Sequence, residues 1–223
     1  MHTFGMAVKT RSPQNARTGE DTRLALLVAA RQQFGENGYA ATLTEDVVAA
    51  AGVTKGALYH HFGGKTELFA EVYEQVKREI SDQAAAVFLR LDPWNALIEG
   101  CRRMLDAQLD PAVRRIVLND ARAVLGWEEV RRIENQHGGV ALRAALRKAM
   151  VAGVIVREPL RPLSLMLTGA LSESVTYVAD APDPVEARAE VDALVHRLLE
   201  GLRPAALTLA PPEQPDRPAT IAG

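Results

Sequence analysis

Between Thr54 and His60 the chain brings together groups suited to binding phosphate and the edges of bases. Lys55 supplies an ammonium group, and Tyr59 and His60 supply hydroxyl and imidazole donors, with few carboxylates nearby to repel an anion. Gly56 lacks a side chain, so the backbone can approach another molecule closely at this position. Contacts to phosphate position a protein on nucleic acid, whereas contacts to base edges select the sequence. These residues therefore predict a contact with nucleic acid.

Two short helices joined by a tight turn would place these groups on one surface. Gly52 falls where the first helix must end, because glycine adopts the left-handed backbone at no steric cost. Thr54 follows as the N-cap of the second helix. Apolar residues allow each helix to bury one face, and they are Val47, Val48, Ala51, Val53 and Leu58. The arrangement is typical of a helix-turn-helix unit, whose second helix enters the major groove of DNA. A helical hairpin in an unrelated bundle is the alternative that periodicity alone allows.

Two adjoining stretches resemble the N-terminal domain of TetR-family transcriptional regulators. The matching residues are Thr22-Arg23-(x)2-Leu26-Leu27-(x)-Ala29-Ala30-(x)3-Phe34-(x)3-Gly38-Tyr39, Thr42, Ala51-Gly52-Val53-Thr54-Lys55-Gly56, Leu58-Tyr59-His60-His61-Phe62 and Lys65-(x)2-Leu68-Phe69. The resemblance runs without a gap over about the first third of the chain. It implies that the first three helices bind DNA, and that the remaining helices bind a small ligand and form a dimer.

The expected DNA contacts divide into two groups. The helix-turn-helix contacts are Thr54, Lys55, Gly56, Tyr59 and His60, and the flanking phosphate contacts are Thr42, Thr44 and Lys65. Lys65 lies at the expected N-terminus of a fourth helix, where backbone N–H groups also favour an anion.

The chain departs from the family pattern at a few positions. Glu45 and Asp46 lie early in the second helix, where the family often has a basic residue. A carboxylate there either stabilises the helix N-terminus or accepts a hydrogen bond from a cytosine amine. Gln33 and Gly35, next to Phe34, weaken the first helix slightly without changing the prediction.

Composition limits the possible function classes. The chain has 223 residues, of which 48% are hydrophobic, and a formal net charge of −2. It can therefore bury a sizeable core, and its charge argues against nonspecific coating of nucleic acid. Up to Lys65 there are seven Lys and Arg against five Asp and Glu, so that this segment carries +2 on an acidic remainder. The asymmetry fits a protein that touches DNA with one end.

Cysteine usage and the lack of long apolar runs suggest a location. The single cysteine, Cys101, rules out an internal disulfide and is expected to be a small buried hydrophobe in a reducing cytosol. No apolar run reaches the roughly 18 residues needed to span a bilayer, and the N-terminus lacks the apolar core of a signal peptide. We therefore expect a cytoplasmic protein with no membrane partner.

The chain is expected to be all-α between two tails. We predict a disordered arm over residues 1–20, a helix-turn-helix domain over 21–64, a ligand-binding and dimerisation domain over 65–203, and a proline-rich disordered tail over 204–223. The arm carries Lys9, Arg11 and Arg17, which either reach an adjacent minor groove or remain solvated. Apolar periodicity predicts a helix from Lys65 to about Leu91, and another from near Trp127 toward Val154 that Gly138-Gly139 interrupts. Three Asp-Pro pairs mark further helix starts, at Asp92-Pro93, Asp110-Pro111 and Asp183-Pro184.

The last two helices carry more apolar surface than a core of this size needs. We interpret this excess as a homodimer interface, in which two such helices from each subunit form a four-helix bundle. The expected interface residues are Leu163, Leu167, Leu171, Leu194 and Leu198.

A small-molecule pocket is expected between the middle helices. Apolar walls with a few hydrogen-bonding groups describe such a site, and the candidate residues are Met104, Gln108, Asn119, Trp127, His137 and Met166. No catalytic residues, metal ligands or cofactor are expected, because the chain lacks a His-x-x-x-His pair, a glycine-rich phosphate loop and a Gly-x-Ser-x-Gly motif.

These features together predict a non-enzymatic, ligand-responsive transcriptional regulator. We expect it to be a repressor that binds a palindromic double-stranded DNA operator as a homodimer and is released by a small hydrophobic or amphipathic effector. An architectural or activator protein without an effector is the alternative.

Overall fold

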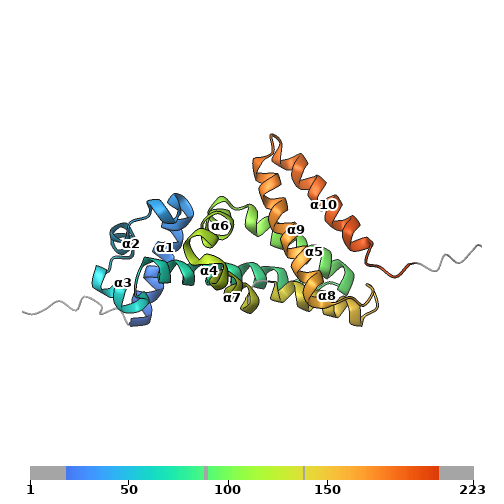
Figure 1. Cartoon of the computed structure of the whole chain (residues 1–223), viewed down its shortest axis with the longest axis horizontal. Helices are drawn as coiled ribbons and strands as arrows, with labels where there is room; N and C mark the ends of the chain where they lie inside the picture. The colour runs from blue at the N-terminus through green and yellow to red at the C-terminus, as the bar shows by residue number, and fades with distance from the viewer. Residues whose placement is uncertain (1–18, 88–89, 138, 206–223) are drawn as a thin grey trace, which may run out of the picture.

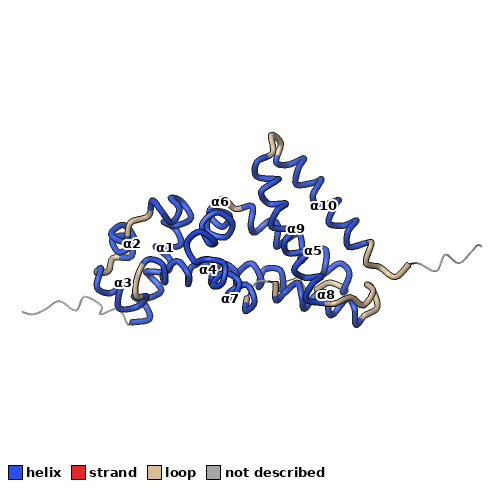
Figure 2. The backbone as a smooth tube through the Cα atoms, viewed as in Figure 1, coloured by secondary structure: helices blue, strands red, loops and turns tan. Residues whose placement is uncertain are grey.

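One long helix, α4 (Lys65–Ala85), joins two groups of helices in the computed structural model. The structure describes residues 19–87, 90–137 and 139–205, and within these ranges every regular element is helical (Figures 1 and 2). The predicted all-α class is confirmed. Three helices lie at one end of the elongated molecule, and the hairpin of the last two projects near the other end (Figure 1).

The first three helices form the predicted helix-turn-helix arrangement. They are α1 (Gly19–Ala41), α2 (Thr44–Ala51) and α3 (Lys55–Phe62). Gly52 ends α2 with φ 64° and ψ 37°, the left-handed conformation that glycine accommodates. Thr54 caps α3, since its Oγ1 accepts a hydrogen bond from the Ala57 amide at 3.2 Å. The buried side chains of Val47 and Leu58 hold the two helices in the core.

A break near the end of α1 turns the chain toward α2. Gly38 has φ 79° and ψ 165°, a region essentially restricted to glycine. The hydroxyl of Thr42 donates to the Gly38 carbonyl at 2.8 Å and lies 3.0 Å from the Gln33 carbonyl. Thr42 is 1% exposed, so its hydroxyl is used within the fold and not at the surface. The expectation that Thr42 holds a phosphate is therefore wrong.

The remaining elements form the second group of helices. They are α5 (Pro93–Leu109), α6 (Pro111–Arg114), the π-helix η1 (Arg115–Asp120), α7 (Ala121–Gln136), α8 (Val140–Val151), α9 (Leu160–Asp180) and α10 (Pro184–Glu200). Four of them, α5, η1, α7 and α8, pack on α4, whereas α9 and α10 pack on α5. The three Asp-Pro starts are confirmed, because Asp92, Asp110 and Asp183 each accept two backbone N–H bonds from the first turn that follows.

One predicted helix is shorter in the structure, and another begins where it was expected. α4 ends at Ala85, so the expected continuation to Leu91 is wrong. α7 starts at Ala121, but Gly126 breaks it with φ 74° and ψ 166°, so that a helical stretch begins near Trp127 as predicted and ends at Gln136. The interruption expected at the glycine pair is present, since Gly139 has φ 68° before α8 begins.

One continuous core connects the two groups of helices. Phe34 and Tyr39 of α1 pack against Phe69 of α4, with ring centroids 5.1 Å and 5.3 Å from that of Phe69. Arg31 adds an ion pair to Glu79 at 2.6 Å. The predicted boundary between the two domains, at residues 64 and 65, falls at the start of α4. The two domains are nevertheless packed together, because α1 contacts α4, α6 and η1. Gly19 and Glu20, expected in the arm, belong to α1, and Lys9, Arg11, Arg17 and residues 206–223 lie outside the described residues.

α9 buries the leucines that we expected at a dimer interface. Leu167 and Leu171 are 9% and 1% exposed and belong to the core, where α9 packs on α5 and α8, and Leu163 is partly buried against the same core. The assignment of Leu167 and Leu171 to the dimer interface is therefore wrong, because the subunit covers them itself, whereas the assignment of Leu163 stays a prediction. Leu194 and Leu198 of α10 are 51% and 57% exposed.

Replacing Gly38 with alanine tests the break in α1. A Cβ at φ 79° and ψ 165° is strained, so Gly38→Ala should lower the free energy of unfolding by about 1–3 kcal/mol. Gly169→Ala is the matched control: Gly169 lies within α9 and an added Cβ there meets nothing within 4 Å, so it should raise stability by roughly 0.5–1 kcal/mol. Urea unfolding of both variants measures the difference, and equal effects would argue against the strained conformation.

Candidate functional site

α3 presents an exposed polar face at the end of the molecule. Lys55, Gly56 and His60 are exposed, and the Tyr59 side chain is 48% exposed. The first turn of α3 carries no carboxylate, and its N-terminal amides are partly free to meet an anion. The structure therefore brings four of the predicted contact residues onto one accessible helix.

An ion pair orients the cation of this face. Lys55 Nζ donates to Glu45 Oε1 at 2.6 Å, and the Thr44 hydroxyl donates to Glu45 Oε2 at 3.0 Å. The hydrogen bond from Lys55 is the largest cause that lowers the pKa of Glu45 to about 2, and the same bond raises the pKa of Lys55. Glu45 of α2 thus fixes the side chain of Lys55, the first residue of α3. A phosphate that binds Lys55 would share its ammonium group with Glu45.

Thr54 and Lys65, two further predicted contacts, have partners within the fold. Thr54 is exposed and caps α3 with its oxygen, which leaves the hydroxyl hydrogen able to donate. Lys65 Nζ lies 4.2 Å from the centroid of the Tyr39 ring, and partial burial lowers the pKa of Lys65. The Tyr39 hydroxyl is 2.8 Å from Thr66 Oγ1, so the ring beneath the ammonium is itself held in place.

A cavity of about 380 Å³ lies between α4, η1, α7 and α9. Its wall contains both apolar and polar or charged side chains. Residues with a polar group include Tyr73, Lys77, Trp127, Glu134 and Thr168. A second cavity, of about 290 Å³, shares Lys77, Trp127, Glu134, Leu165 and Thr168 with the first. Cavities of this size hold small organic ligands.

Only some of the predicted pocket residues line these cavities. Trp127 lines both, whereas Met104 and Gln108 line a void of only about 10 Å³ beside them. Asn119 and Met166 are exposed, and neither borders the two larger cavities, so their assignment to the pocket is wrong. His137 instead pairs through Nε2 with Glu74 Oε1 at 2.7 Å.

The most buried charge at the cavity escaped the sequence analysis. Lys77 is only 6% exposed, and its Nζ lies 3.5 Å from Glu134 Oε1, which also accepts from the Tyr73 hydroxyl at 3.4 Å. Burial, with the neighbouring Glu134 carboxylate, raises the pKa of Tyr73. A sequence signal existed, because Lys77 follows Tyr73 by four residues and precedes Ile80 by three, on the apolar stripe of α4.

Polar contacts also connect the cavity wall to α1. Arg115, the first residue of η1, donates from Nη1 to the carbonyls of Gly35, at 2.7 Å, and Glu36. Asp120, its last residue, accepts from the Tyr39 amide at 2.8 Å. Between them, Val117 and Leu118 line the larger cavity. π-helical segments occur frequently at functional sites, and here one element touches both the cavity and the end of α1.

The described part of the chain contains no group of three or more His, Cys, Asp or Glu side chains that could hold a metal ion. Cys101 is free and buried. No helix in residues 19–87, 90–137 or 139–205 combines the length and apolar character that crossing a membrane requires.

Family models match both parts of the chain. Residues 26–72 match the model for bacterial regulatory proteins of the tetR family, and residues 94–202 match the tetracyclin repressor-like C-terminal domain. Among curated relatives, the TetC protein of transposon Tn10 from Escherichia coli is 30% identical over 118 residues, which cover 53% of this chain and 60% of that protein. The transcriptional regulator TtgR of Pseudomonas putida is 35% identical over 103 residues, covering 44% of this chain and 48% of that protein. The chain thus spans about half of the length of the curated relatives that it matches.

A solved structure extends the similarity to nearly a whole protein. A TetR-family transcriptional regulator from Pectobacterium atrosepticum is 35% identical, with a TM-score of 0.71, and the match covers 85% of this chain and 99% of that one. TtgR and the protein from Pectobacterium atrosepticum are transcriptional regulators. The chain belongs to the TetR family of transcriptional regulators.

Proposed function

We propose that this protein is a ligand-responsive repressor that binds a palindromic operator as a homodimer and is released by a small effector. The proposal rests on two sites that are connected through α1. One is the exposed polar face of α3, and the other is a cavity whose walls include α4 and η1, both of which contact α1. An activator or architectural protein without an effector has no need of a buried charged cavity, so the cavity favours effector control. The similarity of residues 94–202 to a repressor-like domain supports repression.

DNA would meet the exposed face of α3. Lys55 and Tyr59 would contact phosphate, and Gly56 would allow close approach, while His60 lies beside them as a donor. Thr44 and Lys65, from the ends of neighbouring helices, would contact flanking phosphates. Two subunits would place two α3 helices in successive major grooves.

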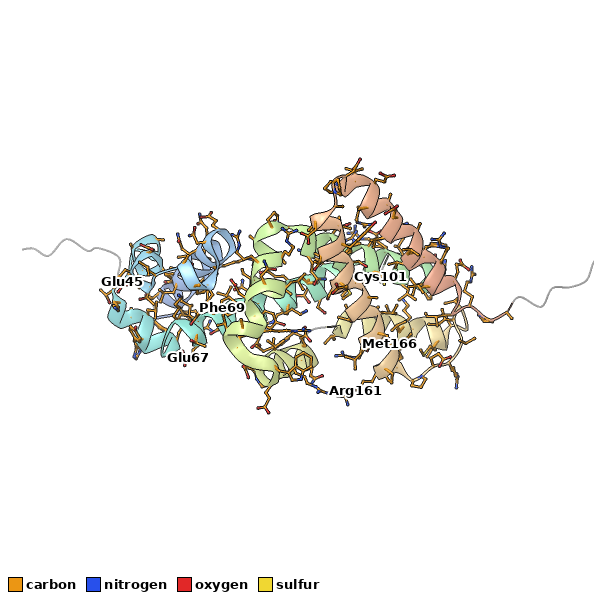
Figure 3. The ribbon with its side chains drawn as sticks, turned by 45° about the horizontal axis from the view of Figure 1, so that its top comes forward. Glu45, Glu67, Phe69, Cys101, Arg161 and Met166 are labelled. Atoms are coloured by element: carbon orange, nitrogen blue, oxygen red, sulfur yellow. The ribbon has the colours of Figure 1, made fainter. Side chains whose placement is uncertain are left out.

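The outer face of the α9–α10 hairpin is the surface we assign to the second subunit. An apolar groove of about 670 Å³ runs between these helices, and Ala170, Tyr177, Val191 and Leu194 are among its lining residues. Met166 and Leu198 add exposed apolar side chains to the hairpin (Figure 3 labels Met166). Exposed apolar patches of this kind mark interaction sites, and a two-fold axis would cover each hairpin with its copy.

Tyr59→Phe tests the DNA contact. It removes only a hydroxyl from an exposed ring, so the unfolding midpoint should not change. Loss of a hydrogen bond to a charged phosphate should weaken operator binding by about 1.5–3 kcal/mol for each half-site. Fluorescence anisotropy with a labelled operator measures this change, and wild-type affinity in the variant would show that the hydroxyl does not touch DNA.

Leu194→Glu tests the interface with an exposed residue, so that the subunit fold is preserved. A carboxylate buried in this apolar groove, which already holds Glu173 and Glu190 against the single cation of Arg197, is unfavourable, and the variant should sediment as a monomer and lose operator affinity. Val151→Glu is the control, because Val151 is a 78% exposed apolar residue at the end of α8 that does not line the groove. A Leu194→Glu dimer that still binds operator would refute this interface.

Replacing Asp120, whose carboxylate bonds η1 to α1, tests the coupling between the cavity and the DNA-binding helices. Asp120→Ala leaves the Tyr39 amide without its acceptor, so the DNA-binding helices should be held less firmly against the cavity wall. Operator affinity should fall by about 0.5–1.5 kcal/mol, the typical net contribution of one hydrogen bond. Asp106→Ala is the control, because it removes an exposed carboxylate that pairs with Arg188 at 2.7 Å between α5 and α10. Equal operator affinity for the two variants, measured by anisotropy, would exclude this route.

A further inference from the structure

We propose that the effector is a small aromatic compound with a carboxylate group, whose acid binds Lys77 and whose ring lies against Trp127. The inference rests on the proposed function, since it names the chemical class of the ligand for the same cavity. Three observations carry it: the position of Lys77, the charge around the smaller cavity, and the exposed indole of Trp127.

Lys77 lies where the cavities meet. It borders the cavities of 380 and 290 Å³ and the void of 10 Å³, a position that it shares with Thr168. Its ammonium has three N–H donors, and Glu134 Oε1 lies 3.5 Å from it. A charge that is 6% exposed needs close partners to offset its lost hydration, and one long ion pair offsets little of that cost. A carboxylate on the effector would supply the missing acceptors.

Positive charge dominates the smaller cavity. Its lining contains Lys77, Arg131, Arg143 and Arg161 against the single carboxylate of Glu134, a formal balance of +3. Arg131 and Arg161 are exposed, and Arg161 lies at the start of α9 (Figure 3). Cations at the rim attract an anion toward the mouth, and the buried ammonium then holds it. A cationic ligand would meet repulsion along the same path.

An aromatic ring fits the shared wall. Trp127 borders both larger cavities and is 55% exposed, although it is a large apolar side chain. The Arg122 guanidinium lies 5.0 Å from the centroid of the Trp127 ring, which positions the indole. Offset stacking on this ring would stabilise a planar ligand. Volumes of about 380 and 290 Å³ suit one or two fused rings.

Three probes with the same ring and different charge test the proposal on the full-length dimer. They are 2-naphthoate, the neutral 2-naphthamide and the cationic 2-naphthylmethylammonium. Isothermal titration calorimetry should give the tightest binding for 2-naphthoate, with the amide weaker by about tenfold or more, the cost of one charged contact. Binding should quench tryptophan fluorescence in a Trp94→Phe background, which leaves Trp127 as the reporter.

Variants of Lys77 assign the effect to this ammonium. Lys77→Met should weaken 2-naphthoate by about tenfold or more and abolish the preference over the amide, while Lys77→Arg should retain that preference. Lys148→Met, which removes an exposed lysine of α8, should behave as wild type. Circular dichroism establishes that each variant is folded. If Lys77→Met does not fold, the ranking of the three probes on the wild type still decides between an acidic and a neutral effector.

Several results would overturn the inference. They are equal or tighter binding of the amide or the ammonium probe, an unchanged 2-naphthoate affinity in Lys77→Met, and no 2-naphthoate binding to the wild type. The proposed function has a separate readout in operator release. If the neutral probe binds in the cavity and releases operator, effector control holds and the acidic class is wrong. If no cavity ligand alters operator affinity, effector control itself fails.

Discussion

The contact between the end of α1 and the first turns after α5 is the constraint on which the rest of the structure depends. A Cβ at Gly35 would lie 2.6 Å from the Ala112 Cβ, so only glycine allows α6 to approach α1 this closely. That approach brings Arg115 to the Gly35 carbonyl and Asp120 to the Tyr39 amide. Without it, the DNA-binding helices would be attached to the rest of the molecule through α4 alone.

Local signals in the sequence predicted the features that depend on neighbouring residues. The turn at Gly52, the cap at Thr54 and the three Asp-Pro helix starts are all present, because each requires only the next few residues of backbone. The role of Gly35 was missed for the opposite reason. Within the sequence it only weakens a helix, and its value is visible only once Ala112, far along the chain, lies against it.

The same distinction explains the errors at the sites. Periodicity shows that α9 has an apolar stripe, but it cannot say whether α5 and α8 or a second subunit will cover it, and the subunit's own core takes Leu167 and Leu171. Thr42 has the chemistry of a phosphate ligand, yet the break at Gly38 turns its hydroxyl inward. Lys77 was overlooked because a lysine is expected to be solvated, and only the packing of α4 against α5, α7 and α8 buries it.

η1 lines the cavity and also contacts α1, and this double role gives a reason for the buried charge of Lys77, which costs stability. Lys77, Tyr73 and Glu134 form contacts of 3.4–3.5 Å, so the network is loosely satisfied and a ligand could rearrange it. Val117 and Leu118 line the cavity, and they lie in η1 between Arg115 and Asp120, the two residues that bond to α1. A ligand that draws Lys77 toward itself would shift α4 and η1 together, and α1 is fixed to both. A well-packed apolar core at this point would be more stable, but it would offer no route for the effector control that we propose.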